Sequence, residues 1–239
     1  MQSPLPDLDL TNAQVIATIA TAARKHIPGF FDCWLTLESG DPLHIRFGEV
    51  RGILDQGIAG SGLSQLEEVP RTKFATSLEP APVYEKSLGG RIFRFMGPPN
   101  YRGISACVGE VVASTLKIID QPSPPPEPVT WAGPIPWDSA IPLLISTRLL
   151  GIYGTPDGLE IRVGSPRGEY GIRPTGLRKL EEQGFPGDRG IGAVDLKTSE
   201  IEQATTLTLS PPTGKGAPVV LVAEGIKVHK VNKVKPATP

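Results

Sequence analysis

The residues with the clearest potential for chemistry lie in the stretch GGRIFRFMGPPNYRG at 89–103, which places three arginines among three aromatic rings. Because successive side chains of a strand point to opposite faces, Arg91, Phe93 and Phe95 would share one face. Exposed rings beside a cation can stack on the bases of single-stranded nucleic acid and neutralise its phosphates. One hypothesis is therefore a nucleic-acid surface made of Arg91, Phe93, Phe95, Tyr101 and Arg102.

The same strand allows two other interpretations, because each of its faces carries two apolar residues and one arginine. It could be buried on both faces with its arginines at the edges, or it could contact another protein. Arg94 lies on the face opposite Phe93 and Phe95 and needs a partner of its own. The stretch also lacks the basic-glycine pair and aromatic spacing of an RNA-recognition motif. The core strand, the protein interface and the nucleic-acid platform all remain open.

Metal and cofactor chemistry find little support among the histidines and cysteines. The three histidines, His26, His44 and His229, are far apart in the sequence, whereas metal ligands commonly occur at short spacings. Cys33 and Cys107 are too few for a zinc site built from cysteine alone, and both lie in apolar runs where we expect reduced, buried thiols. We therefore expect no metal and no cofactor.

Motifs of enzymes are also weak. The segment GLSQL at 62–66 lacks the last glycine of a nucleophilic serine elbow. The glycine-rich loop at 57–62 lacks the Gly-Lys-Ser/Thr ending of a phosphate-binding loop, and the glycine-rich segment 184–192 carries no recognisable motif. A ligand at either loop stays open. With 25 acidic residues, a hydrolase that uses carboxylates distant in sequence is one alternative, although an enzyme is less expected than a non-catalytic protein.

Two tryptophans among prolines offer a different kind of site. Trp131 and Trp137 lie in the segment VTWAGPIPW, where prolines favour extended backbone. Large aromatic side chains on such segments often anchor protein–protein interfaces. The alternative is that both rings cover the core of their own domain.

Charge and hydropathy limit the classes of partner. The chain has 239 residues and a net charge of −1, so no overall field draws it to nucleic acid or to an anionic membrane. No apolar run reaches the roughly 20 residues that span a bilayer. The first residues, MQSPLPD, lack the basic and apolar regions of a signal peptide. We expect a cytoplasmic protein without membrane contact.

The element expected at the start of the chain is a helix over 12–26. Thr11 and Gln14 fit a capping box, and Val15, Ile16 and Ile19 recur at helical spacing. Alternating apolar residues predict strands at 31–37, 43–47, 91–96 and 104–119, and a hairpin at 158–173. Short helices are expected at 63–69 and 177–183.

The segment QPSPPPEP at 121–128, with five prolines in eight residues, predicts an extended linker. It divides the chain into an α+β domain at 1–120 and a mainly β domain at 129–239 with a basic C-terminal tail. The expected fold class is α+β, with the N-terminal helix packed on a mostly antiparallel sheet. This organisation favours an adaptor or structural subunit that acts through protein–protein contact, as an oligomer or part of a larger assembly.

Overall fold

The computed structural model describes residues 4–5, 8–22, 28–78, 90–120, 124–125, 130–166, 168–183, 190–212 and 216–232. In the N-terminal half the elements are β1 (Ala13–Thr21), β2 (Gly29–Thr36), β3 (Pro42–Asp55), β4 (Gly62–Leu63), β5 (Gln65–Val69), α1 (Lys73–Ser77), β6 (Arg91–Pro99) and β7 (Ser105–Ile118). In the C-terminal half they are β8 (Thr130–Ile135), α2 (Trp137–Leu144), β9 (Arg148–Thr155), β10 (Gly158–Ser165), β11 (Gly168–Glu182), β12 (Ala193–Ser199), β13 (Ala204–Ser210) and β14 (Val219–Asn232).

The architecture is almost entirely β, and the expected α+β class is wrong. Strands account for 65% of the structure and helices for 7%. Every ladder is antiparallel, and together they form one connected path in the order β12-β13-β14-β11-β10-β9-β1-β2-β3-β7-β6-β5. β4 pairs with β1, β8 with β14, and β11 additionally with β3. Within the described residues, strand β1 lies where the N-terminal helix over 12–26 was expected.

The first strand, β1, shows why the helical pattern was misleading. Asn12 has a φ of +60°, which does not continue into a right-handed helix. The backbone N–H of Thr11 donates to Asp9 Oδ1 at 2.9 Å, so Thr11 lies in a turn. A bulge between Val15 and Ala17 then shifts the alternation of β1 by one residue. This shift, together with burial on both faces, imitates the spacing of an amphipathic helix; positions 23–26 of the expected helix lie outside the described residues.

The two short helices expected at 63–69 and 177–183 are also wrong. Residues 62–63 form β4 and residues 65–69 form β5, which pairs with β6. Residues 177–182 are the end of β11, which pairs with β14 and, at Leu180–Glu182, with β3. A bulge between Leu177 and Lys179 again breaks the alternation there. The hairpin expected at 158–173 is present: β10 and β11 pair from Ile161 opposite Ile172 to Ser165 opposite Gly168.

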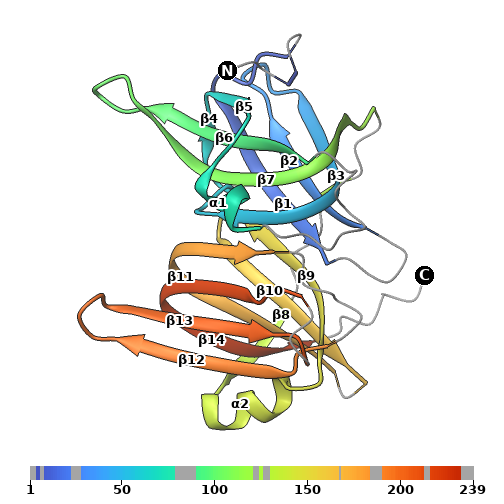
Figure 1. Ribbon diagram of the computed structural model, residues 1–239, viewed down its shortest axis with the longest axis vertical. Coiled ribbons are helices and arrows are strands. Elements are labelled where there is room, and N and C mark those ends of the chain that lie inside the picture. Colours follow the sequence, from blue (N-terminus) through green and yellow to red (C-terminus); the bar gives the residue numbers. More distant parts are fainter. Residues whose placement is uncertain are drawn as a thin grey trace.

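Figure 1 shows the two halves of the chain one above the other, with β1–β7 in the upper half and β8–β14 in the lower half. Two ladders cross between them: β1 with β9, and β3 with the end of β11. Buried residues of both halves belong to one hydrophobic cluster. The division at 121–128 remains a prediction, and most of the proline-rich segment lies outside the described residues.

Two hairpins extend from the same side of the molecule (Figure 1). The upper hairpin is formed by β6 and β7, and its turn comprises residues 100–104. The lower hairpin is formed by β12 and β13, and its turn comprises residues 200–203. Both turns project beyond the packed body of the protein.

Candidate functional site

The base of the β6–β7 hairpin lies in the core of the N-terminal half. Phe93 and Phe95 are 0% and 1% exposed. The Phe93 ring centroid lies 5.2 Å from that of Phe47, and Phe95 is 6.0 Å from Phe31 and 5.7 Å from Phe47. Aromatic pairs at these separations contribute stability beyond simple burial. The rings are therefore not available to stack on bases, and the strand is a core strand.

The arginines of β6 are held by carboxylates from neighbouring strands. Arg91 binds Glu68 of β5 through both carboxylate oxygens, with Nε–Oε1 at 2.9 Å and Nη2–Oε2 at 2.5 Å. This pairing raises the pKa of Arg91 and lowers the pKa of Glu68. Arg94 is opposite Glu67 on one side and Glu110 on the other, with its Nε 3.4 Å from Glu110 Oε1. Both arginines therefore form ion pairs with carboxylates of adjacent strands and support the sheet.

The two tryptophans cover the C-terminal half. Trp131 is half-buried and packs against Gly171, because a Cβ atom on Gly171 would lie only 2.3 Å from the Trp131 ring. The guanidinium of Arg173 lies 5.7 Å from the centroid of the same ring. Trp137, at the start of α2, donates from Nε1 to the carbonyl of Ile226 at 3.2 Å and packs against the core. These contacts fit the alternative in which the tryptophans cap their own core.

The turn of the β6–β7 hairpin is held by the side chain of Asn100. Its Oδ1 accepts hydrogen bonds from the backbone N–H groups of Arg102 at 2.9 Å and Ile104 at 3.2 Å. The backbone of Asn100 also donates to the carbonyl of Ile104 and accepts from Gly103. Gly103 has a φ of +73°, which favours glycine. Four hydrogen bonds therefore fix a five-residue turn.

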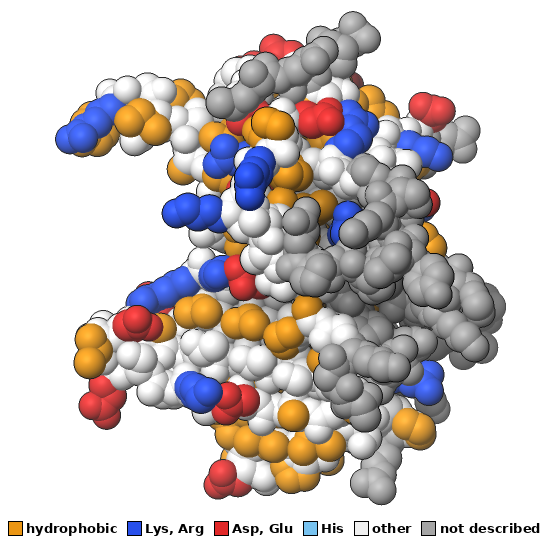
Figure 2. Space-filling view, viewed as in Figure 1, with side chains coloured by type: hydrophobic (Ala, Val, Ile, Leu, Met, Phe, Trp, Pro, Cys, Tyr) orange, Lys and Arg blue, Asp and Glu red, His pale blue; other side chains and the backbone are white. Residues whose placement is uncertain are grey.

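This ordered turn exposes large side chains. Tyr101 is 89% exposed and Ile104 is 62% exposed. The guanidinium of Arg102 lies 5.2 Å from the centroid of the Tyr101 ring. We call Tyr101, Arg102 and Ile104 the upper tip. Figure 2 shows its basic and hydrophobic side chains together at the end of the projecting hairpin.

The turn of the β12–β13 hairpin differs in composition. Ile201 is 98% exposed and is flanked by Glu200 and Glu202, which are also exposed. Arg178 of β11 donates to the backbone carbonyl of Glu202 at 2.8 Å. We call Glu200, Ile201 and Glu202 the lower tip. Its charge is acidic and its single large apolar side chain is aliphatic (Figure 2).

A polar cluster on β2 and β3, in which Asp32 and His44 are buried, was not anticipated from the sequence. Asp32 accepts from Arg46 through both oxygens, at 2.7 and 2.8 Å, and its Oδ1 lies 3.0 Å from His44 Nε2. His44 is 2% exposed, and the centroid of its ring lies 4.4 Å from that of Trp34 in a stacked arrangement. The register of the β2–β3 hairpin brings these residues together. Asp32 and His44 are buried, whereas the side chain of Arg46 is 45% exposed, so the cluster joins the two strands and reaches the surface at Arg46.

The cysteines and possible metal ligands add no site. Cys33 is a buried free thiol, and burial raises its pKa far above the ordinary value, so it is not an activated nucleophile. Cys107 is a half-buried free thiol. Within the described ranges, no group of three or more His, Cys, Asp or Glu residues could hold a metal ion. In the same part of the chain, no helix has the length and apolar character needed to cross a membrane.

Comparison of the chain with protein-family models, with curated proteins and with solved structures found no significant match.

Proposed function

We propose that this protein is a non-catalytic structural or adaptor subunit, and that the upper tip is its contact surface for another protein chain. The observation that carries the proposal is the ordered turn that holds Tyr101 and Ile104 in solvent. Exposed hydrophobic side chains on a fixed backbone lose little conformational entropy when they bind.

The composition of the upper tip supports a protein partner. Tyrosine and arginine are the residue types enriched among those that dominate binding energy at protein interfaces. Arg102 lies over the Tyr101 ring, so the two side chains present one amphipathic surface. Arg91 and Arg94, by contrast, form ion pairs with Glu68 and Glu110 within the sheet. Of the arginines and aromatic rings at 89–103, Arg102 and Tyr101 are therefore the pair available to a partner.

A cytoplasmic location is part of the same proposal. Its support is that Cys33 and Cys107, the two cysteines of the chain, are both free thiols. Free thiols are typical of reducing compartments.

To test the proposal, the tagged protein is isolated from its native cells, and its mass in solution is measured by size-exclusion chromatography with light scattering. We expect the parent to elute as an assembly heavier than one chain, and the Tyr101→Ser/Ile104→Ser variant to elute at the mass of a single chain. The Ile201→Ser variant, which removes the exposed isoleucine of the lower tip, is the matched control and should keep the assembly. A parent that is itself a single chain, or an assembly that survives the Tyr101→Ser/Ile104→Ser change, overturns the proposal.

A further inference from the structure

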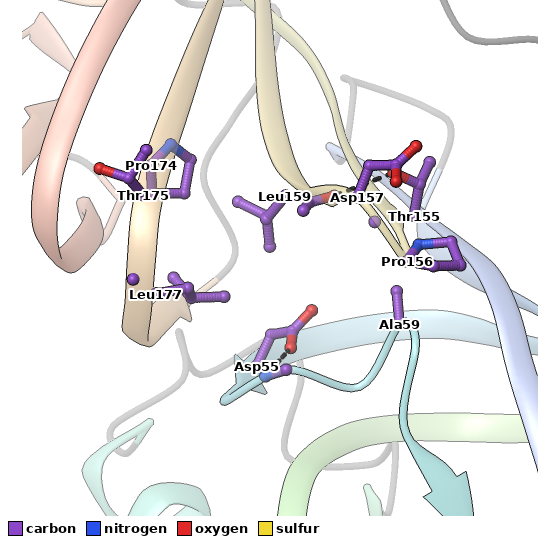
Figure 3. Close-up of a pocket in the computed structure, with 13 residues that line it drawn as sticks. Asp55, Ala59, Thr155, Pro156, Asp157, Leu159, Pro174, Thr175 and Leu177 are labelled. Atoms are coloured by element: carbon purple, nitrogen blue, oxygen red, sulfur yellow. Dashed lines mark hydrogen bonds between the residues drawn. The ribbon is translucent and has the colours of Figure 1, made fainter.

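A cavity of about 340 Å³ lies between the two halves of the chain. Its floor is the end of β3 and the loop that follows, and its walls are the β9–β10 turn and a bend in β11 (Figure 3). Residues from three separated parts of the sequence therefore meet around one space. Among its lining residues are Asp55, Pro156, Asp157, Leu159, Pro174 and Leu177.

Asp55 is the charged group on the floor of this cavity, and it is 3% exposed. Its Oδ1 accepts two hydrogen bonds, from the backbone N–H groups of Gly57 and Ile58, both at 2.8 Å. These bonds close the turn after β3. The other oxygen, Oδ2, takes part in neither bond and points into the cavity (Figure 3).

The carboxylate of Asp55 has no basic partner within the described part of the chain. No lysine or arginine among the described residues lines the cavity or forms an ion pair with Asp55. Burial raises the pKa of Asp55, and the two backbone hydrogen bonds oppose this only in part. An ionised carboxylate in such a place is costly unless a cation joins it. The side-chain oxygen of an asparagine could accept the same two backbone hydrogen bonds, so the turn after β3 does not by itself require a carboxylate at position 55.

We propose that this cavity binds a primary alkylammonium group, with the ammonium on Asp55 Oδ2 and the alkyl chain between the prolines and leucines of the walls. Pro156, Leu159, Pro174 and Leu177 supply the apolar lining that such a chain requires. Asp157, exposed on the β9–β10 turn at the rim, adds negative charge that attracts a cation towards the opening. This site is separate from the upper tip and stands without it.

The geometry of Asp55 favours ammonium over guanidinium. A guanidinium group gains most from two parallel bonds to both oxygens of a carboxylate, as Arg46 makes with Asp32. In Asp55 one oxygen is already occupied by two backbone groups, so a single oxygen remains. An ammonium is a compact charge that needs only that one oxygen. The same carboxylate disfavours phosphate, which the glycine-rich loop at 57–62 had left open.

The test is a titration of the ¹⁵N-labelled protein with n-butylammonium, followed through the backbone amide signals of Gly57, Gly158 and Gly176. We expect saturable shifts in the parent. Asp55→Asn keeps an oxygen that can accept from Gly57 and Ile58 but removes the charge, and should weaken the affinity at least about tenfold. Asp157→Asn, at the exposed rim, is the matched control and should weaken it much less. The neutral isostere n-butanol should bind far more weakly, and n-butylguanidinium should bind more weakly than n-butylammonium.

Two further probes distinguish where the amine comes from. A capped Gly-Lys-Gly peptide that binds as tightly as n-butylammonium indicates a lysine side chain of another polypeptide. Binding by n-butylammonium and a free diamine, with weak binding by the peptide, indicates a small amine. The proposal is overturned if the parent shows no saturable shifts, if Asp55→Asn binds n-butylammonium as well as the parent does, or if n-butanol or n-butylguanidinium binds as tightly as n-butylammonium.

Discussion

The base and the tip of the β6–β7 hairpin come from one short stretch of sequence, yet they have opposite environments. At the base, Phe93 and Phe95 alternate along a strand and are almost completely buried. At the tip, Tyr101 follows two prolines and a turn-forming asparagine, and is 89% exposed. Whether an aromatic residue of this stretch lies in the core or at the surface therefore depends on its place in the hairpin. The base should therefore govern stability, and the tip should govern binding.

The largest expected effect separates the base from the tip. Phe95→Ala removes a ring packed against Phe31 and Phe47 and should lower the free energy of unfolding by about 3–5 kcal/mol. Denaturant unfolding followed by fluorescence or circular dichroism measures this loss. Phe95→Leu, which keeps much of the volume, should cost clearly less. A loss below about 1 kcal/mol for Phe95→Ala would mean that the base is not part of the core.

Two glycines, Gly109 at the base and Gly103 at the tip, differ in the same way. At the base, a Cβ on Gly109 would lie 2.3 Å from Ile58 Cδ1 and 2.8 Å from the carbonyl of Leu54, so Gly109→Ala should cost about 1–3 kcal/mol through overpacking. At the tip, a Cβ on Gly103 meets nothing within 4 Å. Gly103→Ala should cost only about 1 kcal/mol, because of its positive φ. Gly103→Asn should cost less still, since asparagine tolerates that backbone; equal losses for Gly103→Ala and Gly103→Asn would contradict this.

A smaller, pH-dependent effect is expected at Asp55, which pairs with Gly109 at the base of the hairpin. Its pKa is raised by burial, so its favourable contribution is present below the ordinary pKa of aspartate and is lost as the pH rises through the raised value. Asp55→Asn should therefore be more stable than the parent at pH 8, with the advantage disappearing towards pH 3. Urea unfolding at several pH values, without added amines, measures this difference. If the stability of Asp55→Asn relative to the parent increased as the pH falls, Asp55 would not have a raised pKa in the folded protein.

The sequence predicted the strand alternation and the shared face of Arg91, Phe93 and Phe95, and it left open whether that face was core. It could not identify β1, because a bulge at Val15–Ala17 and burial on both faces imitate a helix. It missed the cluster of Asp32, His44 and Arg46, although the expected strands at 31–37 and 43–47 would place these residues on adjacent strands. It also missed the position of Asp55 on the floor of a cavity, because the walls of this cavity come from residues about 100 and 120 positions later in the chain.

The smallest effect on stability is expected at the tip itself. Tyr101→Ser should change the free energy of unfolding by less than about 0.5 kcal/mol, since the side chain contacts little beyond Arg102. The turn remains fixed because its hydrogen bonds come from Asn100 and the backbone. Denaturant unfolding of this variant beside Phe95→Ala gives the two ends of the comparison. A loss above about 2 kcal/mol would show that Tyr101 supports the fold.

The most direct test of the upper tip as a contact surface is photo-crosslinking in native cells with p-benzoylphenylalanine at position 101. We expect an adduct with a defined protein, either a second copy or another chain, whose yield falls when Arg102→Ser and Ile104→Ser are added. The same probe at position 201, which is 98% exposed in the parent, should give a clearly lower yield of that adduct. Equal yields from positions 101 and 201, or an adduct at 101 that is unaffected by Arg102→Ser and Ile104→Ser, would contradict it.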